Sequence, residues 1–431
     1  LSFKDEAILS FEPTSDKFLE NYYCTKIYPG NKVLKLGILY GANASGKTNI
    51  LKSLDFLRSQ AIIPKRDKLK KVKFTPFLFD PSTKDAPGEF SITFFVDQFK
   101  YIYSIILNNN VILSEKLVYY PSNQPALLFD RTYDPDHKIS SIKFGEKSKL
   151  SNEAQTILKG NTINNTSVIA SYSISNVTSQ QLDKVLGWFK FSLRPIILPS
   201  TNLLGWTNSR VEESQKCKDF VLEVLNKADF AIEDIQFQEK ELELDNNLIS
   251  QINKMPIPEE EKQDIIEKGS IKPKILNFIH KALSADGESG NHLLPQDLES
   301  QGTLRYYGLS GVLNLLINDK VTVSIDELEN SLHYDLLIHF IKTFLVNSEH
   351  SQLIFSTHDI SILNERDLVR RDTIWFTEKN DKGFSELFSL SDFKFHKNIS
   401  EFNRYRIGKL GAKPNLGNIF ITNTNEKKPS P

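Results

Sequence analysis

Apolar and polar positions follow three different patterns along this chain, and each pattern predicts a different kind of element. Residues 33–40, VLKLGILY, form an apolar run typical of a buried strand, and NILKSLDFL at 49–57 has helical spacing. Between residues 72 and 145 apolar and polar positions alternate, as in EFSITFFVDQFKYIYSIIL, with a break at the NNN of 108–110. This alternation predicts an antiparallel β lobe with a turn at the break. From about 150 to 292 the sequence is polar with helical spacing, which predicts an inserted helical arm.

Two further apolar runs, in the last third of the chain, also predict strands. VTVSI at 321–325 is rich in β-branched residues, and LIF at 353–355 is followed by Ser356, Thr357, His358 and Asp359. Runs of this kind are typical of strands buried on both faces. Strands and helices together predict an α/β fold.

Composition limits the class of protein. Of the 431 residues, 39% are hydrophobic and 25% charged, and the formal charge of −1 gives the whole chain no attraction for nucleic acid or membranes. The two cysteines, Cys24 and Cys217, form no metal-like spacing and fit a reducing compartment. No run approaches the roughly 20 apolar residues of a membrane span. We therefore expect a cytoplasmic protein of two or three lobes, and since the only methionine is Met255, we expect residues before Leu1 to be missing.

The stretch GANASGKT at 41–48 fits the phosphate-binding pattern G-x-x-x-x-G-K-[ST]. Gly41 and Gly46 allow a tight turn whose backbone N–H groups point at phosphates, Lys47 reaches the β and γ oxygens, and Thr48 offers its hydroxyl to Mg²⁺. The following helix adds the positive end of its dipole. The stretch at 41–48 lies between a predicted strand and a predicted helix, and this place favours nucleotide binding over an ordinary glycine turn. The predicted nucleotide-binding residues are Gly41, Asn43, Ala44, Ser45, Gly46, Lys47, Thr48 and Asn49.

An acidic pair, Asp326 and Glu327, directly follows the predicted strand at 321–325. In a phosphate-loop fold the first acid at a strand end can hold magnesium through water, and the next can orient or deprotonate the attacking water. On its own the pair is equally consistent with solvated acids at the end of a strand. We expect Asp326 to join Thr48 at the metal and Glu327 to be catalytic.

A second anion site is predicted before the helix that starts near residue 301. Ser300, Gly302 and Thr303 offer hydroxyls and backbone N–H groups there, although a simple N-cap would look the same. His358 ends the strand at 353–355, where it could polarise a γ-phosphate or be a structural histidine. We predict Ser300, Gly302 and Thr303 to bind nucleotide and His358 to be catalytic.

The order of these four motifs resembles the ABC-type ATPase head, including SMC-like and OLD-like heads. More narrowly, the chain resembles the AAA family ATPases of bacterial anti-phage and abortive-infection systems, which include the AbiL type paired with an RloB-like protein, the AriA type of PARIS and the PtuA type of Septu. The resemblance is carried by SFKDEAILS, GANASGKTN, PGEFSITFFVDQFKYIYSI, KADFAIEDIQFQEKELEL, LESQGT, IDELENSLH, QLIFSTHD, RRDTIWFTEKNDKGFSELFSLSDF and YRIGKLGAKPNL.

This resemblance implies a homodimer, or a higher oligomer, whose copies sandwich ATP and Mg²⁺. The phosphate loop with Lys47 in one copy would face Ser300 and Gly302 of the other, and Ser331 and His333 would lie in a dimer-contact loop. Two copies would thus explain two anion sites in one chain. The resemblance also implies a partner effector protein, which we expect to be a nuclease. DNA is a further candidate partner, and we expect no contact with a membrane.

The resemblance divides the chain into four parts. The expected domains are the N-terminal half of the ATPase head at 1–149, the helical arm at 150–292, the C-terminal half at 293–422 and a disordered tail at 423–431. Without a sustained heptad, the arm is expected to be short rather than a long coiled coil.

Two alternatives act directly on DNA. An OLD-type nuclease would need a metal-dependent cutting domain after His358, for which the sequence offers no acidic cluster, and an SMC-like repair ATPase would need a long coiled coil. The basic stretch PKRDKLKKVK at 64–73 is more typical of a solvated linker but is the best local candidate for nucleic acid. Gln60 and the segment at 76–80 are candidates for the family's switch glutamine region, without a firm choice.

Overall fold

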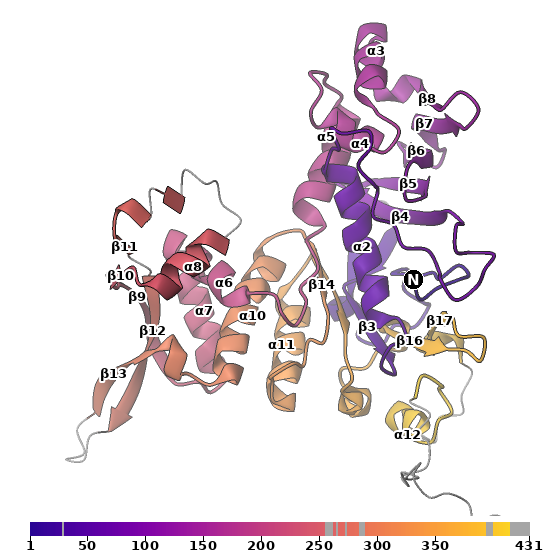
Figure 1. Ribbon diagram of the computed structural model, residues 1–431. Helices are drawn as coiled ribbons and strands as arrows, with labels where there is room; N and C mark the ends of the chain where they lie inside the picture. The colour runs from indigo at the N-terminus through magenta and orange to yellow at the C-terminus, as the bar shows by residue number, and fades with distance from the viewer. Residues whose placement is uncertain are drawn as a thin grey trace, which may run out of the picture. The chain divides into compact units, whose positions relative to one another are not determined.

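The structure of the chain is a computed structural model that describes residues 1–27, 30–254, 262–263, 266–271, 274–283, 289–393 and 400–413. These residues form two compact units, which are described separately (Figure 1). The first unit comprises Leu1–Pro199, Asp319–Leu328 and Ser348–Pro431, and the second comprises Ser200–Asn318 and Glu329–Asn347.

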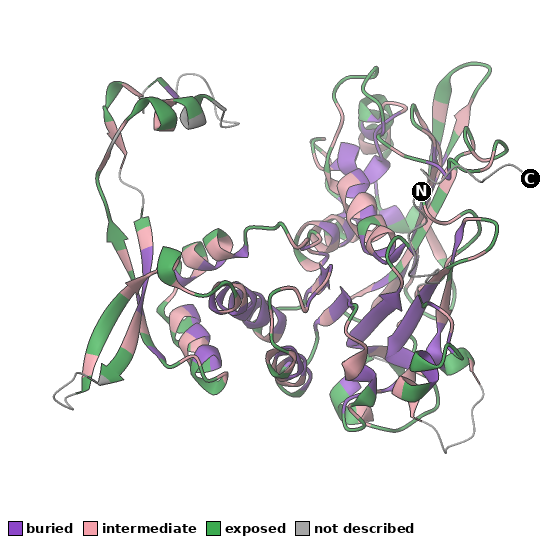
Figure 2. Ribbon diagram, turned by 60° about the horizontal axis from the view of Figure 1, so that its bottom comes forward, coloured by how far each residue is buried: buried purple, intermediate pink, exposed green. Residues whose placement is uncertain are grey.

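A five-stranded sheet forms the centre of the first unit. Its strand order is β14-β15-β3-β16-β17, with four parallel strands and an antiparallel edge strand. Strand β3 is buried along its whole length because helices and loops cover both faces of the sheet (Figure 2). The predicted strands at 321–325 and 353–355 are confirmed. The run at 33–40, predicted as one strand, is divided at Lys35, because residues 33–34 end β2 in a separate two-stranded sheet and only the later part forms β3. The bounds are β14 (Thr322–Ile325), β15 (Gln352–Ser356), β3 (Leu36–Gly41), β16 (Ile374–Lys379) and β17 (Ser385–Ser389).

The predicted antiparallel β lobe is a meander of five strands in sequence order. Alternate residues of β5 are buried, as the period-two pattern predicts. The predicted turn is also present, since Asn108 N donates to Val111 O over 3.0 Å. The bounds are β4 (Gly88–Val96), β5 (Phe99–Leu107), β6 (Ile112–Tyr120), β7 (Ala126–Asp134) and β8 (Ile139–Phe144).

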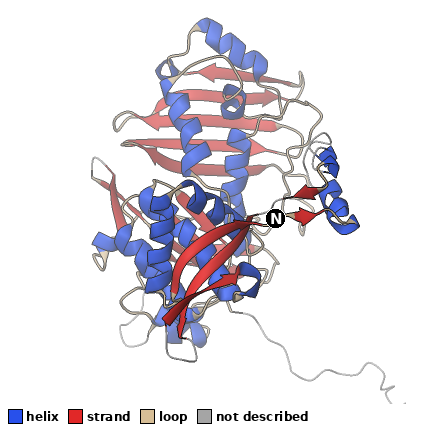
Figure 3. Ribbon diagram, turned by 90° about the vertical axis from the view of Figure 1, so that its left-hand side faces the viewer, coloured by secondary structure: helices blue, strands red, loops and turns tan. Residues whose placement is uncertain are grey.

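Helices cross one face of this meander (Figure 3). One apolar core joins the strands to these helices and includes Leu57, Tyr103, Leu158 and Val185. The arm was expected to begin at residue 150, whereas the residues up to Pro199 belong to the first unit because their apolar faces are buried against the β lobe. The helices are α2 (Lys47–Ile62), α3 (Asn152–Asn161), α4 (Val168–Tyr172) and α5 (Gln180–Gly187). The unit also contains α1 (Glu20–Tyr23), β1 (Cys24–Ile27), β2 (Asn31–Leu34) and α12 (Glu401–Arg406).

The second unit combines helices with a small sheet. Two glycines of its longest described helix allow close helix packing: a Cβ at Gly308 would lie 2.7 Å from Leu203 Cβ, and one at Gly311 would lie 2.4 Å from Thr207 Oγ1. The three-stranded sheet β13-β12-β9 falls partly in the range predicted as a helical arm, which corrects that prediction. The buried residues of β9, Ile232 and Ile235, are three positions apart, a spacing that also fits a helix. The bounds are α6 (Leu203–Glu213), α7 (Gln215–Lys227), α8 (Asn246–Lys254), α10 (Gln301–Asn318), α11 (Tyr334–Asn347), β9 (Ile232–Glu239), β10 (Leu242–Glu243), β11 (Ser270–Ile271), β12 (Lys274–Leu283) and β13 (Ser289–Pro295).

Three further sequence predictions concern the tail of the chain, its division into domains and membrane spans. The tail expected at 423–431 lies outside the described residues, and the four-part domain division stays a prediction. In the described part of the chain, no helix combines the length and the apolar character that crossing a bilayer requires.

Candidate nucleotide site

The candidate site lies where parallel strands of the first unit end. Strand β3 leads into the phosphate loop at 41–46 and then α2, β14 leads into Asp326 and Glu327, and β15 leads into Thr357 and His358. Because parallel strands place their carboxyl ends at the same edge of a sheet, three motifs that are distant in sequence meet there.

The phosphate loop has the backbone that its glycines allow. Gly46 has φ 108° and Ala44 φ 60°, both left-handed, so the peptide units turn sharply before α2 begins at Lys47. A Cβ at Gly41 would lie 2.4 Å from Thr377 O and from Ser45 Oγ, so no larger residue fits. Lys47 Nζ donates to Gly41 O over 2.8 Å and to Ala42 O over 3.2 Å. The ammonium is therefore folded over the loop that would cradle phosphates.

Thr48 and Asp326 meet across the site. Thr48 Oγ1 lies 2.9 Å from Asp326 Oδ2 and 3.1 Å from Oδ1. Asp326 is 5% exposed, and Ser356 Oγ donates to its Oδ1 over 2.6 Å. A hydroxyl and a buried carboxylate at this separation are the oxygen donors that Mg²⁺ prefers beside a nucleotide, so the residues present fit that ion.

Glu327 and His358 lie at the exposed side of the same edge. Glu327 Oε1 is 3.9 Å from His358 Nε2, and their side chains are 46% and 39% exposed, so solvent reaches both. Glu327 has φ 50°, a left-handed backbone that is uncommon for a residue with a side chain. Its backbone N donates to Ser356 Oγ over 2.9 Å, which helps to hold this conformation.

Ser300, Gly302 and Thr303 belong to the second unit, where they begin α10. Ser300 Oγ accepts from Thr303 N over 3.0 Å and lies 2.8 Å from Thr303 Oγ1, which is an N-cap arrangement. A Cβ at Gly302 would lie 3.3 Å from Ser331 O, so Ser331, expected in a dimer-contact loop, lies beside the predicted second anion site. Whether these residues bind nucleotide stays a prediction.

Sequence reasoning gave no role to Ser356 or Thr377. Ser356 is fully buried and bonds both acids, and its only signal was its place beside Thr357 at a strand end. Thr377 is also fully buried, and its Oγ1 lies 2.6 Å from Ser45 Oγ. Its position in an ordinary strand offered no signal at all. Asn49, predicted to bind nucleotide, donates from Nδ2 to Ser2 Oγ over 2.5 Å.

Of the two candidates for the switch glutamine region, Gln60 lies away from the phosphate loop. Gln60 is in the last turn of α2, where its Oε1 accepts from Lys65 Nζ over 3.0 Å. At a rise of about 1.5 Å per residue this places it about 20 Å along the helix from Lys47. In the segment at 76–80, Phe77 packs against Phe384 and Asp80 pairs with Lys4. Gln60 therefore does not serve as a phosphate-site glutamine.

Among the described residues, no group of three or more His, Cys, Asp or Glu side chains could hold a metal ion. A magnesium ion beside a nucleotide needs no such group, because phosphate oxygens and water complete its coordination.

Residues 37–364 match the family described as "AAA domain, putative AbiEii toxin, Type IV TA system". This match covers more than half of the chain. The chain belongs to this AAA domain family. The matched range of the AAA domain contains the phosphate loop, Ser300, Asp326, Glu327 and His358, which agrees with the predicted α/β phosphate-loop ATPase fold. No curated protein matches the sequence.

Solved structures similar to the AAA domain include three SMC heads. The SMC head domain from Thermotoga maritima covers 85% of this chain and 97% of its own at 12% identity and a TM-score of 0.36. An SmcHead bound to the C-winged helix domain of ScpA covers 85% and 95% at 12% identity and a TM-score of 0.31. An SMC head with an extended coiled coil bound to the C-terminal domain of ScpA, derived from Pyrococcus furiosus, covers 89% and 95% at 12% identity and a TM-score of 0.30.

Proposed function

We propose that the chain is a Mg²⁺-dependent ATPase. The observation that carries this proposal is the meeting of Thr48, Asp326 and Ser356 directly beside the phosphate loop. A magnesium ion would supply charge neutralisation at the phosphates. The chain's own contribution is to hold the triphosphate with Lys47 and the backbone N–H groups at the start of α2.

Glu327 is the proposed base for the attacking water. It follows Asp326 directly, faces solvent and lies close to His358, so a water held by its carboxylate could lose a proton to it. His358 is placed at the end of the neighbouring strand, where its imidazole could donate to a γ-phosphate oxygen.

Replacing Glu327 by Gln is expected to lower ATP turnover by about 100-fold or more while preserving ATP binding, because the change removes a proton acceptor and leaves the phosphate loop intact. Turnover is measured by phosphate release and binding by calorimetry. Glu153→Gln, an exposed position on α3, is the matched control and should hydrolyse ATP like the wild type. Equal turnover in Glu327→Gln and the wild type would reject the proposed base.

We further propose that two copies sandwich ATP and that this closure controls a partner effector, a nuclease, in anti-phage defence. The family description, which names a type IV TA system, and the motif order support this proposal. Cells that carry the gene with its operon neighbour should survive phage infection as a population, and Lys47→Ala should abolish that protection. Full protection by the chain without any neighbouring gene would contradict effector control.

A further inference from the structure

The basic stretch at 64–73, here named the basic loop, holds a fixed conformation in the first unit. Five of its six cations, Arg66, Lys68, Lys70, Lys71 and Lys73, are exposed, Lys65 is half-buried, and Asp67 is its single acid. We propose that the basic loop is a docking surface for the phosphate backbone of a nucleic acid.

Buried residues from elsewhere in the chain hold the backbone of the basic loop. Asn165, 1% exposed, donates from Nδ2 to Asp67 O over 2.9 Å and to Lys70 O over 2.7 Å. Thr166, also 1% exposed, accepts from Lys65 N over 3.1 Å and donates to Lys65 O over 3.0 Å. At the far end, Val72 N donates to Asn109 O over 2.8 Å. The loop is thus bonded at its start, middle and end.

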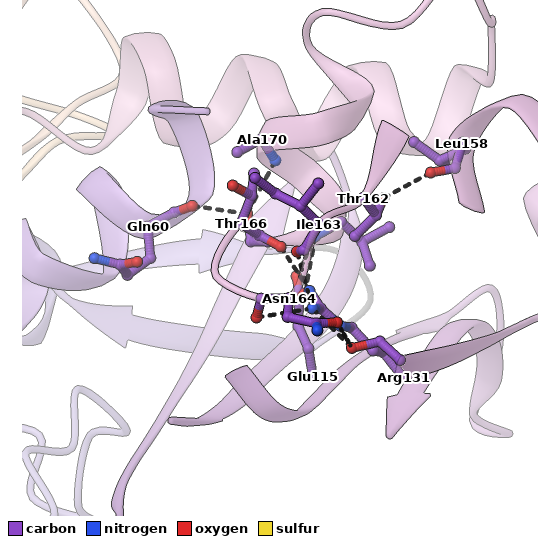
Figure 4. Close-up of polar contacts among 12 residues, drawn as sticks. Gln60, Glu115, Arg131, Leu158, Thr162, Ile163, Asn164, Thr166 and Ala170 are labelled. Carbon is purple, nitrogen blue, oxygen red and sulfur yellow. Dashed lines mark hydrogen bonds and ion pairs between the residues drawn. The ribbon is translucent and has the colours of Figure 1, made fainter. Parts of the chain in front are cut away.

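These anchors are in turn held by a buried ion pair (Figure 4). Arg131, fully buried, donates from Nη1 to Thr166 O over 2.6 Å and from Nη2 to Asn164 O over 3.0 Å. Its Nη1 lies 3.5 Å from Oε2 of Glu115, which is also fully buried. Glu115 Oε2 accepts from Val168 N over 2.9 Å at the start of α4. The turn that carries Asn165 is therefore fixed from inside the β lobe.

This support distinguishes the basic loop from a linker that only keeps a protein soluble. A solvated charged linker needs no buried anchors, and burying a guanidinium and a carboxylate is costly. Fixing the backbone keeps five like charges within a short segment, where they raise a positive potential that extends about a Debye length, roughly 8 Å at physiological salt. Such a potential attracts a polyanion.

The surroundings of the basic loop favour a nucleic acid backbone over an acidic protein. The adjoining turn exposes the amides of Asn109 and Asn110, and Lys, Arg and Asn side chains are the usual partners of phosphate oxygens. Protein interfaces instead centre on apolar and aromatic anchors. Here the exposed apolar residues are Leu69 and, just before the loop, Ile63. The basic loop itself contains no aromatic residue.

The test measures binding of the full chain to a fluorescent 30-base-pair DNA duplex and to a 30-nucleotide single-stranded RNA by anisotropy at several salt concentrations. The triple variant Lys68→Glu, Lys70→Glu and Lys71→Glu should bind at least tenfold more weakly. A plot of log affinity against log salt concentration should have a slope that is smaller in magnitude by about 2 to 3. Each phosphate contact releases about 0.7 to 0.9 counterions, and the variant loses three such contacts. Replacement of the same lysines by Arg should preserve affinity.

The matched control replaces three exposed lysines outside the basic loop, with Lys147→Glu, Lys216→Glu and Lys382→Glu, so its net charge changes by the same amount. It should bind both nucleic acids within about twofold of the wild type. Equal weakening by the two triple variants would overturn the proposal. So would the absence of binding to both nucleic acids at 50 mM salt, or a wild type that binds polyglutamate or phosphatidylserine vesicles but neither nucleic acid. ATP turnover of the basic-loop variant should match the wild type, which separates this test from that of Glu327.

Discussion

At the scale of single residues, Thr377 supports the phosphate loop from the adjacent strand. Its Oγ1 lies 2.6 Å from Ser45 Oγ and donates to Tyr40 O over 3.3 Å, at the point where β16 pairs with Gly41 of β3. Thr377→Val keeps the shape of the side chain and removes these bonds, which are worth about 1 kcal/mol. We expect ATP to bind about fivefold more weakly by calorimetry.

Thr377→Ser is the control for this prediction, since it keeps the hydroxyl and removes a methyl group. It should bind ATP more tightly than Thr377→Val. If Val and Ser variants bind equally, the hydroxyl has no part in shaping the loop.

Lys35 is expected to give the fold a pH dependence. It is 3% exposed, its Nζ donates to Ser348 O over 2.6 Å, and burial lowers its pKa to about 8. Between pH 8 and the ordinary pKa of 10.5 the unfolded chain binds more protons than the folded chain, so Lys35 makes the free energy of unfolding rise with pH in that window. The slope approaches about 1.4 kcal/mol per pH unit.

Lys35→Met removes this titration while keeping an unbranched side chain. The difference in free energy of unfolding between the wild type and Lys35→Met, from urea melts at pH 8 to 10.5, should therefore increase with pH. A difference that stays constant over this range would show that Lys35 is not titrating below its ordinary pKa.

At the scale of elements, the C-terminal segment 401–413 packs behind the nucleotide site. Tyr405 of α12 stacks on Phe376 of β16 with ring centroids 5.8 Å apart, and it lies 6.3 Å from the ring of Tyr40 at the end of β3. Tyr40 Oη in turn donates to Asp359 O over 3.3 Å, next to His358. One aromatic cluster thus joins the two strands and the loops that follow them.

Tyr405→Ala should lower the free energy of unfolding by about 3 kcal/mol, because it removes a buried ring. Tyr405→Phe keeps the ring and loses only the bond from Tyr405 Oη to Ala412 O, so its cost should be about 1 kcal/mol. Urea melts measure both. Equal costs for the two variants would show that ring packing is not what holds the segment.

The elements differ in how far the sequence predicts them. The β lobe was predicted because period-two alternation is a local signal, and the phosphate loop because its residues are adjacent in sequence. The support from Thr377 was not predictable, since Ser45 and Thr377 are 332 residues apart and only the sheet order brings them together. The sheet of the second unit was not predicted within the helical arm, because the buried residues of β9, Ile232 and Ile235, lie three positions apart, a spacing that a helix also gives.

At the scale of the whole molecule, the two predicted anion sites belong to different units. The chain passes from the first unit to the second between Leu328 and Glu329, directly after the acidic pair whose Asp326 bonds Thr48. Ser300 caps α10 in the second unit, and Ser331 lies beside Gly302 there. The sandwich of ATP between the phosphate loop of one copy and Ser300 of the other is therefore a prediction about assembly.

The proposed nucleotide sandwich is tested most sharply by the mass of Glu327→Gln in solution, measured by light scattering with and without saturating ATP and Mg²⁺. If two copies share each nucleotide, we expect a monomer of 49.3 kDa without nucleotide, a dimer of twice that mass with it, and a return to monomer when Ser300→Arg is added. A protein that binds ATP to saturation and stays at 49.3 kDa would contradict the shared nucleotide site.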